Sequence, residues 1–201
     1  MKKFIAIAAA ALLMAGLSAC NGKNTAATGT DGTEGVTYRE IETLSSVEVT
    51  DETKILVAYF DPDGSVKAAA NEIAAQTGAD IFELKTEIDY SGDALAVVRN
   101  EISDGYEIQP DIKNGVLAES YDLVFLGFPA PDGLLPAEIY SFININDLRD
   151  KVIIPFVTDY DGDCPAVTDV IDSISHGSSQ ALMFNTEKDT DINAWLTGLG
   201  F

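Results

Sequence analysis

Six aspartates could supply oxygen ligands for a hard cation, because they fall in three turns that each contain an Asp-Gly pair. The candidate ligands are Asp61, Asp63, Asp132, Asp159, Asp161 and Asp163. Ca²⁺ takes several carboxylate and carbonyl oxygens, so these acids would form a calcium site if the fold gathered them. The alternative is that Asp and Gly are simply the usual residues of tight turns.

The most suggestive local spacing is Asp159-x-Asp161-x-Asp163, which matches the start of a calcium-binding loop. Such a loop has glycine at its sixth position and glutamate at its twelfth. Cys164 and Val170 occupy those positions here. The local match is therefore incomplete, and a cation site would need acids from the other turns.

Other reactive groups are few. His176 is the only histidine and lies near Ser175 and Ser178, but no Gly-x-Ser-x-Gly motif accompanies it, so hydrolysis is not favoured. Cys20 and Cys164 are the only cysteines, which excludes a zinc site built from His and Cys. We expect Cys164 to be an inert thiol, because neighbouring carboxylates disfavour the thiolate.

Strands followed by helices must position these turns. Residues 55–60 (ILVAYF) form an unbroken apolar run, typical of a strand buried on both faces. Residues 61–64 (DPDG) have turn chemistry, and Ser65 is the predicted N-cap of a helix over 66–76, where apolar residues recur at helical spacing. This is the first half of a βαβ unit, whose turn lies at the ligand-binding edge of the sheet.

The same alternation continues to the C-terminus. Further strands are expected at 80–86, 122–128, 151–158 and 179–185, and further helices at 92–103, 136–145, 165–174 and 189–199. Asp189 is the predicted N-cap of the last helix. Pro155 is awkward within a strand, because proline lacks the N–H that a ladder needs. The pattern predicts an α/β doubly wound parallel sheet of five strands in the order 2-1-3-4-5.

The N-terminus has the features of a targeting segment. Lys2 and Lys3 precede an apolar stretch at 4–17, which is too short for a comfortable membrane span. The LSAC ending resembles a bacterial lipobox, which implies cleavage of a signal peptide at 1–19 and lipidation of Cys20. An ordinary cleaved signal peptide is the alternative. We therefore expect an extracytoplasmic lipoprotein, anchored to the outer membrane or cell surface.

A flexible tether is expected at 20–50, because its first part is small, polar and without periodicity. It precedes one domain at 51–201. The formal net charge of −21 repels nucleic acid, so we expect no nucleic-acid partner. A cation or a basic protein is the favoured kind of partner.

Four stretches resemble bacterial flavodoxin-like domains, and more narrowly the branch related to NAD(P)H-quinone reductases. They are KILVAYF, YDLVFLGFPAPDGLLPAEIYSFI, DKVIIPFVTDYDGD and the terminal AWLTGLGF, and the resemblance extends over 54–201. In that family three loops at one edge of the sheet hold FMN. The resemblance implies FMN binding and electron transfer, and the enzyme class would be an FMN-dependent oxidoreductase. The positions carried over are Asp61, Asp63, Gly64, Ser65, Val66, Pro129, Ala130, Pro131, Asp132, Gly133, Thr158, Asp159, Tyr160 and Gly162.

The first of these loops departs from the family pattern, Ser/Thr-x-Thr-Gly-Asn-Thr, whose hydroxyls donate to the FMN phosphate. Asp61 and Asp63 replace the first two hydroxyl residues and Val66 replaces the last. A carboxylate about 4 Å from a phosphate costs on the order of 4 kcal/mol at an effective dielectric near 20. A helix N-terminus stabilises a phosphate by only about 0.3–2 kcal/mol. The net interaction is therefore repulsive unless both aspartate side chains point away from the phosphate.

The second loop also lacks the tryptophan pair that shields the flavin ring in the family. Tyr160 in the third loop is the one aromatic placed to stack on a flavin, whereas Trp195 falls at core spacing in the last helix. Two hypotheses follow. The domain either binds FMN and transfers electrons, or it is a non-flavin module whose acidic edge binds a cation such as Ca²⁺ or a basic partner.

Overall fold

A parallel sheet of five strands forms the centre of the domain. The computed structural model describes residues 49–106, 110–149, 151–160, 162–174 and 183–201, all within one compact unit. The sheet order is β2-β1-β3-β4-β5 and every pair is parallel, so the predicted α/β fold is confirmed. The strands are β1 (Ile55–Tyr59), β2 (Asp80–Glu83), β3 (Leu123–Pro129), β4 (Val152–Thr158) and β5 (Phe184–Asn185).

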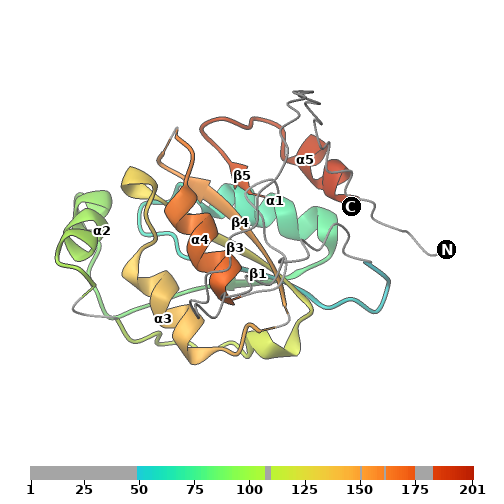
Figure 1. The fold of residues 1–201 in the computed structure, drawn as a ribbon, viewed down its shortest axis with the longest axis horizontal. Coiled ribbons are helices and arrows are strands. Elements are labelled where there is room, and N and C mark those ends of the chain that lie inside the picture. Colours follow the sequence, from blue (N-terminus) through green and yellow to red (C-terminus); the bar gives the residue numbers. More distant parts are fainter. Residues whose placement is uncertain (1–48, 107–109, 150, 161, 175–182) are drawn as a thin grey trace, which may run out of the picture. The chain divides into compact units, whose positions relative to one another are not determined.

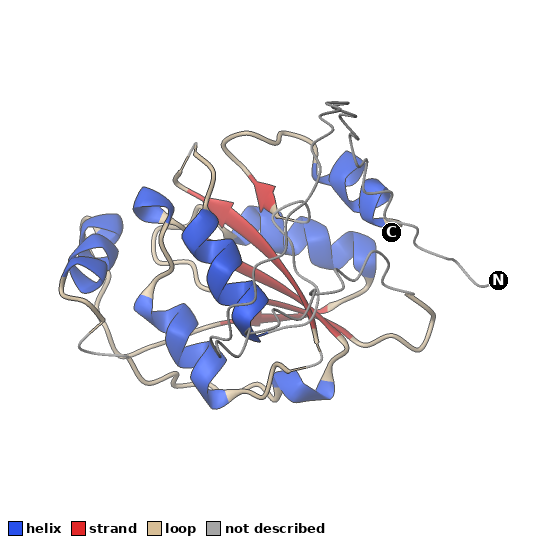
Figure 2. Ribbon diagram, viewed as in Figure 1, coloured by secondary structure: helices blue, strands red, loops and turns tan. Residues whose placement is uncertain are grey.

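Helices cover both faces of this sheet (Figures 1 and 2). They are α1 (Lys67–Thr77), α2 (Ala94–Ser103), α3 (Ala137–Ile145), α4 (Pro165–Ile174) and α5 (Ile192–Leu199), with short 3₁₀ turns η1 (Ala118–Ser120) and η2 (Pro131–Gly133). In the part of the chain that is described, none of the helices has the length and apolar character needed to cross a membrane.

Several predictions lie outside the described residues. These are the signal peptide at 1–19, Cys20 and the tether as far as residue 48, together with Asp161, His176 and the part of the fifth strand at 179–182.

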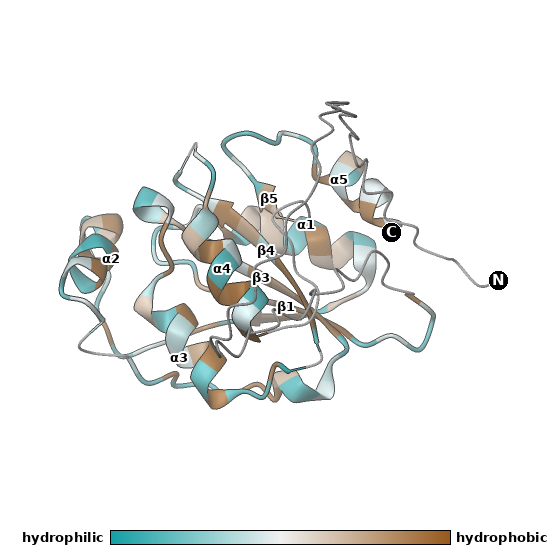
Figure 3. Cartoon of the chain, in the orientation of Figure 1, coloured by the Kyte–Doolittle hydropathy of each residue, from teal (hydrophilic) through white to brown (hydrophobic). Residues whose placement is uncertain are grey.

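The strand β1 is buried on both faces, as its unbroken apolar run predicts. Ile55, Val57 and Tyr59 pack in one hydrophobic cluster with α1 and α5. The alternate residues Leu56 and Ala58 pack in a second cluster with α2, α3 and α4. Figure 3 shows the apolar strands at the centre and polar segments in several connecting loops. Complete burial of one Leu or Phe side chain stabilises a fold by about 1.5–3 kcal/mol. Each cluster contains many such side chains, so together they hold the strands, and with them the strand ends, in place.

Pro155 lies inside β4, opposite Leu126 of β3. On the other side of β4, the described part of β5 pairs only with Phe156 and Val157. The proline thus stands just beyond the end of that ladder, where a missing N–H is tolerated.

Two predicted helix caps are wrong. Ser65 does not cap α1: the N-cap residue is Val66, which makes no side-chain cap bond, and the Ser65 hydroxyl lies 2.9 Å from that of Thr158 instead. Asp189 does not cap α5, because its carboxylate accepts from the Asn185 amide at 3.1 Å. Asp191 caps α5, since its side chain accepts a bond from the first turn.

Replacement of Gly127 by alanine tests the closeness of β3 and β4. A Cβ at Gly127 would overlap the ring of Phe156, which is completely buried. We expect Gly127→Ala to lower the free energy of unfolding in urea by about 1–3 kcal/mol, the usual cost of overpacking a core.

The matched control is Gly198→Ala on the exposed side of α5, where an added methyl meets nothing within 4 Å. This change should stabilise the domain by about 1 kcal/mol through helix propensity alone. Similar unfolding free energies for the two variants would contradict the tight packing of β3 on β4.

Candidate functional site

Three loops meet where β1, β3 and β4 end, and we call the surface they form the rim. The Ser65 hydroxyl of the first loop donates to Asp159 Oδ2 in the third at 3.0 Å. The Ala130 amide of the second loop donates to the carbonyl of Thr158 at 2.9 Å. The predicted meeting of these loops at one edge is therefore present in the structure. The rim consists of the described residues 61–66, 129–134, 158–160, 162 and 163.

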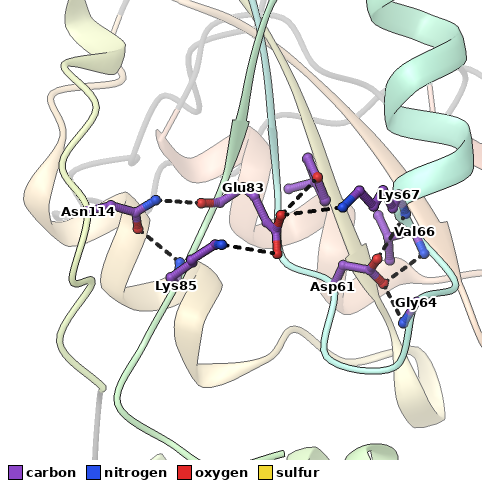
Figure 4. Close-up of polar contacts among 8 residues, drawn as sticks. Asp61, Gly64, Val66, Lys67, Glu83, Lys85 and Asn114 are labelled. Carbon is purple, nitrogen blue, oxygen red and sulfur yellow. Dashed lines mark hydrogen bonds and ion pairs between the residues drawn. The ribbon is translucent and has the colours of Figure 1, made fainter.

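The carboxylate of Asp61 lies inside the first loop and binds its backbone (Figure 4). Asp61 Oδ1 accepts from the amides of Gly64 and Val66, both at 3.0 Å. Asp61 Oδ2 accepts from the amide of Lys67 at 3.2 Å. Gly64 allows this curvature because its φ is +93°, which L-residues rarely adopt. Asp61 thus occupies the anion-binding position at the N-terminus of α1.

Asp63 completes the same arrangement. Its Oδ1 accepts from the Ser65 amide at 3.1 Å. Every amide from Gly64 to Lys67 therefore donates to a carboxylate of this chain. While these bonds hold, none of the four amides is available to an external anion.

The second loop has an exposed aspartate held beside a helix. Asp132 has a φ of +56°, a left-handed conformation that Asp tolerates better than most residues. Its Oδ2 lies 3.8 Å from the Nε of Arg99 on α2. The Asp132 side chain is 74% exposed, so this ion pair contributes only about 0–1 kcal/mol. The preceding residues Pro129, Ala130 and Pro131 are buried and belong to the scaffold of the loop.

Tyr160 packs against the backbone of the rim. A Cβ at Gly133 would come within 2.9 Å of Tyr160 Cε1, and a Cβ at Gly162 would overlap the same ring. The side chain is partly buried against the cluster that contains α4. The two glycines therefore make room for the ring between the second and third loops. Stacking of Tyr160 on a flavin remains a prediction.

Asn185, at the end of β5, fixes the backbone of the third loop, and the sequence analysis did not identify this residue. The side-chain amide of Asn185 donates to the carbonyls of Tyr160 and Gly162 at 2.9 and 3.3 Å. Thr158 is buried, and its hydroxyl donates to Asp159 Oδ2 at 2.6 Å. The only signal for Asn185 in the sequence is a polar residue at the end of a predicted strand.

Five of the six candidate aspartates are described, and Asp161 lies outside the described residues. Among the residues that are described, no group of three or more acidic, His or Cys side chains could hold a metal ion. Asp61 binds amides, as shown above, and Asp163 Oδ1 lies 2.7 Å from Lys188 Nζ. The hydrogen bond from Lys188 lowers the pKa of Asp163. The acids that the structure describes thus have partners within the chain.

Glu83, which the sequence analysis also missed, extends the acidic region to the end of β2 (Figure 4). Its carboxylate lies 3.9 Å from Lys67 Nζ and 4.0 Å from Lys85 Nζ. It also accepts from the hydroxyl of Tyr59 at 3.3 Å. Burial first, and then the charge of Glu83, raise the pKa of Tyr59 to about 12, so the phenol stays neutral. The predicted strand at 80–86 placed Glu83 in its middle, whereas the strand ends at Glu83 in the structure, so the sequence contained no signal for this residue.

The sequence and the structure both match known proteins. The flavodoxin family model matches residues 54–197. A candidate flavoprotein from Bacteroides eggerthii is similar, with a TM-score of 0.63 and 25% identity over 74% of this chain and 99% of that one. A candidate flavoprotein from Bacteroides uniformis has a TM-score of 0.59 and 25% identity over 72% and 98%.

A flavoprotein from Lactobacillus acidophilus, solved in complex with FMN, has a TM-score of 0.53 and 18% identity over 72% of this chain and 99% of that one. At that identity the likeness shows the fold alone. None of the curated proteins matches the sequence.

The backbone of the first loop is suited to bind the phosphate of FMN, but its side chains are not. The amides of Gly64, Val66 and Lys67 converge on one anionic group, which is the arrangement that a phosphate needs. The anion that they hold is the carboxylate of Asp61. A phosphate and this carboxylate would compete for the same donors.

Removal of the Asp61 carboxylate should therefore destabilise α1. We expect Asp61→Ala to lower the free energy of unfolding by about 1–2 kcal/mol, as for the loss of a strong helix cap. Asp63→Ala is the matched control, because Asp63 accepts one loop bond and its loss should cost about 0.5 kcal/mol. Chemical denaturation measures both, and equal costs would show that Asp61 is not the principal partner of the loop.

Proposed function

The chain belongs to the flavodoxin family, and we propose that its rim binds FMN in competition with the carboxylate of Asp61. The observation that supports this proposal is the convergence of the Gly64, Val66 and Lys67 amides on one anion. Bound FMN would supply one- or two-electron redox chemistry. The role of this chain would be to hold the cofactor and to set its affinity.

Because Asp61 competes for the same amides, we expect a lower affinity for FMN than a loop lined by hydroxyl groups would have. FMN must displace Asp61 from bonds in which the acceptor is charged, and such bonds contribute about 1.5–3 kcal/mol each. The displaced carboxylate stays on the same loop. Two charges about 4 Å apart interact by about 4 kcal/mol at an effective dielectric near 20. Lys67 offers limited compensation, because its ammonium lies 3.9 Å from Glu83.

Flavin stacking would use the ring of Tyr160, which is partly exposed and lies against Gly133 and Gly162. Asn185 would hold the backbone of the third loop in place, since it binds the carbonyls of Tyr160 and Gly162.

The bonds from the loop amides to Asp61 and Asp63 also favour a second function. In this alternative no flavin binds, and the rim is an acidic surface for a basic partner. The supporting observation is that two carboxylates of the chain already saturate the amides from Gly64 to Lys67. The exposed side chain of Asp132 would then belong to the contact surface, and binding would weaken with salt.

Titration with FMN distinguishes the two functions. We expect Asp61→Ser to bind FMN at least about tenfold more tightly than the wild type, because relief of about 1.4 kcal/mol of the repulsion suffices for that factor. Flavin fluorescence quenching measures the affinity.

The matched control is Asp51→Ser, which removes one exposed carboxylate in the turn before β1, at the opposite end of that strand from the rim. It should leave the affinity unchanged. No binding by either the wild type or Asp61→Ser would reject the flavin function and leave the second function standing.

We further propose that the domain is tethered to a membrane through lipid on Cys20. The support is the LSAC ending of the apolar leader in the sequence. Cys20→Ala should move the protein from the membrane fraction to the soluble fraction, and mass spectrometry should find acyl chains on the wild type alone. An unmodified Cys20 in the mature wild type would contradict the anchor.

A further inference from the structure

Three buried polar atoms have no hydrogen-bond partner among the described residues, and all belong to α2 and α3. They are Glu101 Oε2, Glu138 Oε2 and Ser141 Oγ. Glu138 is completely buried and Ser141 is 6% exposed, so neither can rely on bulk water. Buried polar atoms normally have partners. Two ionised carboxylates with such poor hydrogen bonding are therefore unfavourable where α2 packs against α3.

The hydroxyl of Tyr90 joins the two carboxyl groups. It makes a short contact with Glu138 Oε1 and lies 3.3 Å from Glu101 Oε1. A phenol carries one proton and can donate to only one of these oxygens. If both carboxyl groups were ionised, the other oxygen–oxygen contact would contain no hydrogen. The geometry is satisfied when one carboxyl group carries a proton of its own.

We propose that Glu101, Tyr90 and Glu138 form a buried proton-binding site, in which the two carboxyl groups together hold one proton at mildly acidic pH and thereby keep α2 against α3. In this arrangement Glu138 donates to the oxygen of Tyr90, and Tyr90 donates to the ionised Glu101. One carboxylate then remains in the core instead of two. The proposal is independent of FMN binding.

Among the described residues that act on Glu138, none is a cation that could replace that proton. Tyr90, in the connection before α2, and Glu101, on α2, are the titratable side chains that act on it. Arg99 is the only cation in α2, and its guanidinium lies beside Asp132. Burial is the main cause that raises the pKa of Glu138 to about 7, and the charge of Glu101 adds to it. Burial also raises the pKa of Glu101.

The site lies directly behind the rim. Tyr90 packs edge-on against Phe60 with ring centroids 5.3 Å apart, and Phe60 precedes Asp61 in the chain. Arg99 on α2 reaches Asp132 in the second rim loop. Loss of the shared proton would place two negative charges together in an apolar environment. We expect α2 to loosen from α3 as a result, together with its contact to the second loop.

The direction in which stability changes with pH follows from the number of protons bound in the folded and unfolded states. The ordinary pKa of Glu138 is 4.5, and in the folded protein it rises to about 7. Between these values the folded state holds a proton that the unfolded chain releases. The stabilisation is thus fully present below pH 4.5 and is lost as the pH rises through about 7.

Unfolding measured as a function of pH tests the site. The wild type is compared with Glu138→Gln, which keeps the shape of a neutral carboxyl group, and with Glu119→Gln, which removes a charge from an exposed position. Relative to Glu138→Gln, the unfolding equilibrium constant of the wild type should rise by up to about tenfold per pH unit in this window. Glu119→Gln should follow the wild type. The same pH profile for the wild type and Glu138→Gln would overturn the proposal.

A second measurement decides the question if Glu138→Gln does not fold. Infrared spectroscopy of the wild type at pH 6 should show the carbonyl stretch of a neutral carboxylic acid, and this band should disappear as the pH is raised. Amide hydrogen exchange in α2, corrected for its intrinsic pH dependence, should speed up over the same range. Absence of a neutral-acid band at pH 6 would contradict the shared proton.

Discussion

The bonds from three backbone amides to the carboxylate of Asp61 are the contact on which the arrangement of the rim depends. They close the first loop, cap α1 and neutralise the partial positive charge of the helix start with an anion from the chain itself. The loop therefore carries an anion of its own at the position where the proposed FMN phosphate would bind. If the rim binds FMN, an internal and an external anion compete for the same amides, and the internal one has the advantage of being covalently attached.

The proposed competition would be confined to the first loop. β1 is buried on both faces, so its packing in the core fixes the end of the strand from which this loop begins. Gly133 and Gly162 leave room for the Tyr160 ring, and Asn185 holds the third loop from below. Asp132 and Asp159 adopt positive φ values in the same region. Such conformations are tolerated where the surroundings fix them, and they concentrate at binding sites.

Hydrophobic patterning sufficed for the fold but not for the detailed contacts of the rim. The apolar runs of β1, β3 and β4 and the alternation with helices correctly predicted the sheet order. The predicted cap Ser65 was wrong because the more distant Asp61 carboxylate accepts from the amides of Val66 and Lys67. The predicted cap Asp189 was wrong because α5 begins later and Asp191 caps it. The repulsion of a phosphate by Asp61 stays a prediction; the structure adds that this carboxylate turns inward and accepts from the loop amides. Glu101 and Glu138 could not be identified as a pair, since only the packing of α2 on α3 brings them to Tyr90.

Nuclear magnetic resonance of the loop amides in the wild type, Asp61→Ala and Asp63→Ala tests the central interaction most directly. If Asp61 accepts from the amides of Gly64, Val66 and Lys67, the proton shifts of all three should move upfield in Asp61→Ala, whereas Asp63→Ala should mainly move that of Ser65. Unchanged shifts of the three amides in Asp61→Ala would contradict the account.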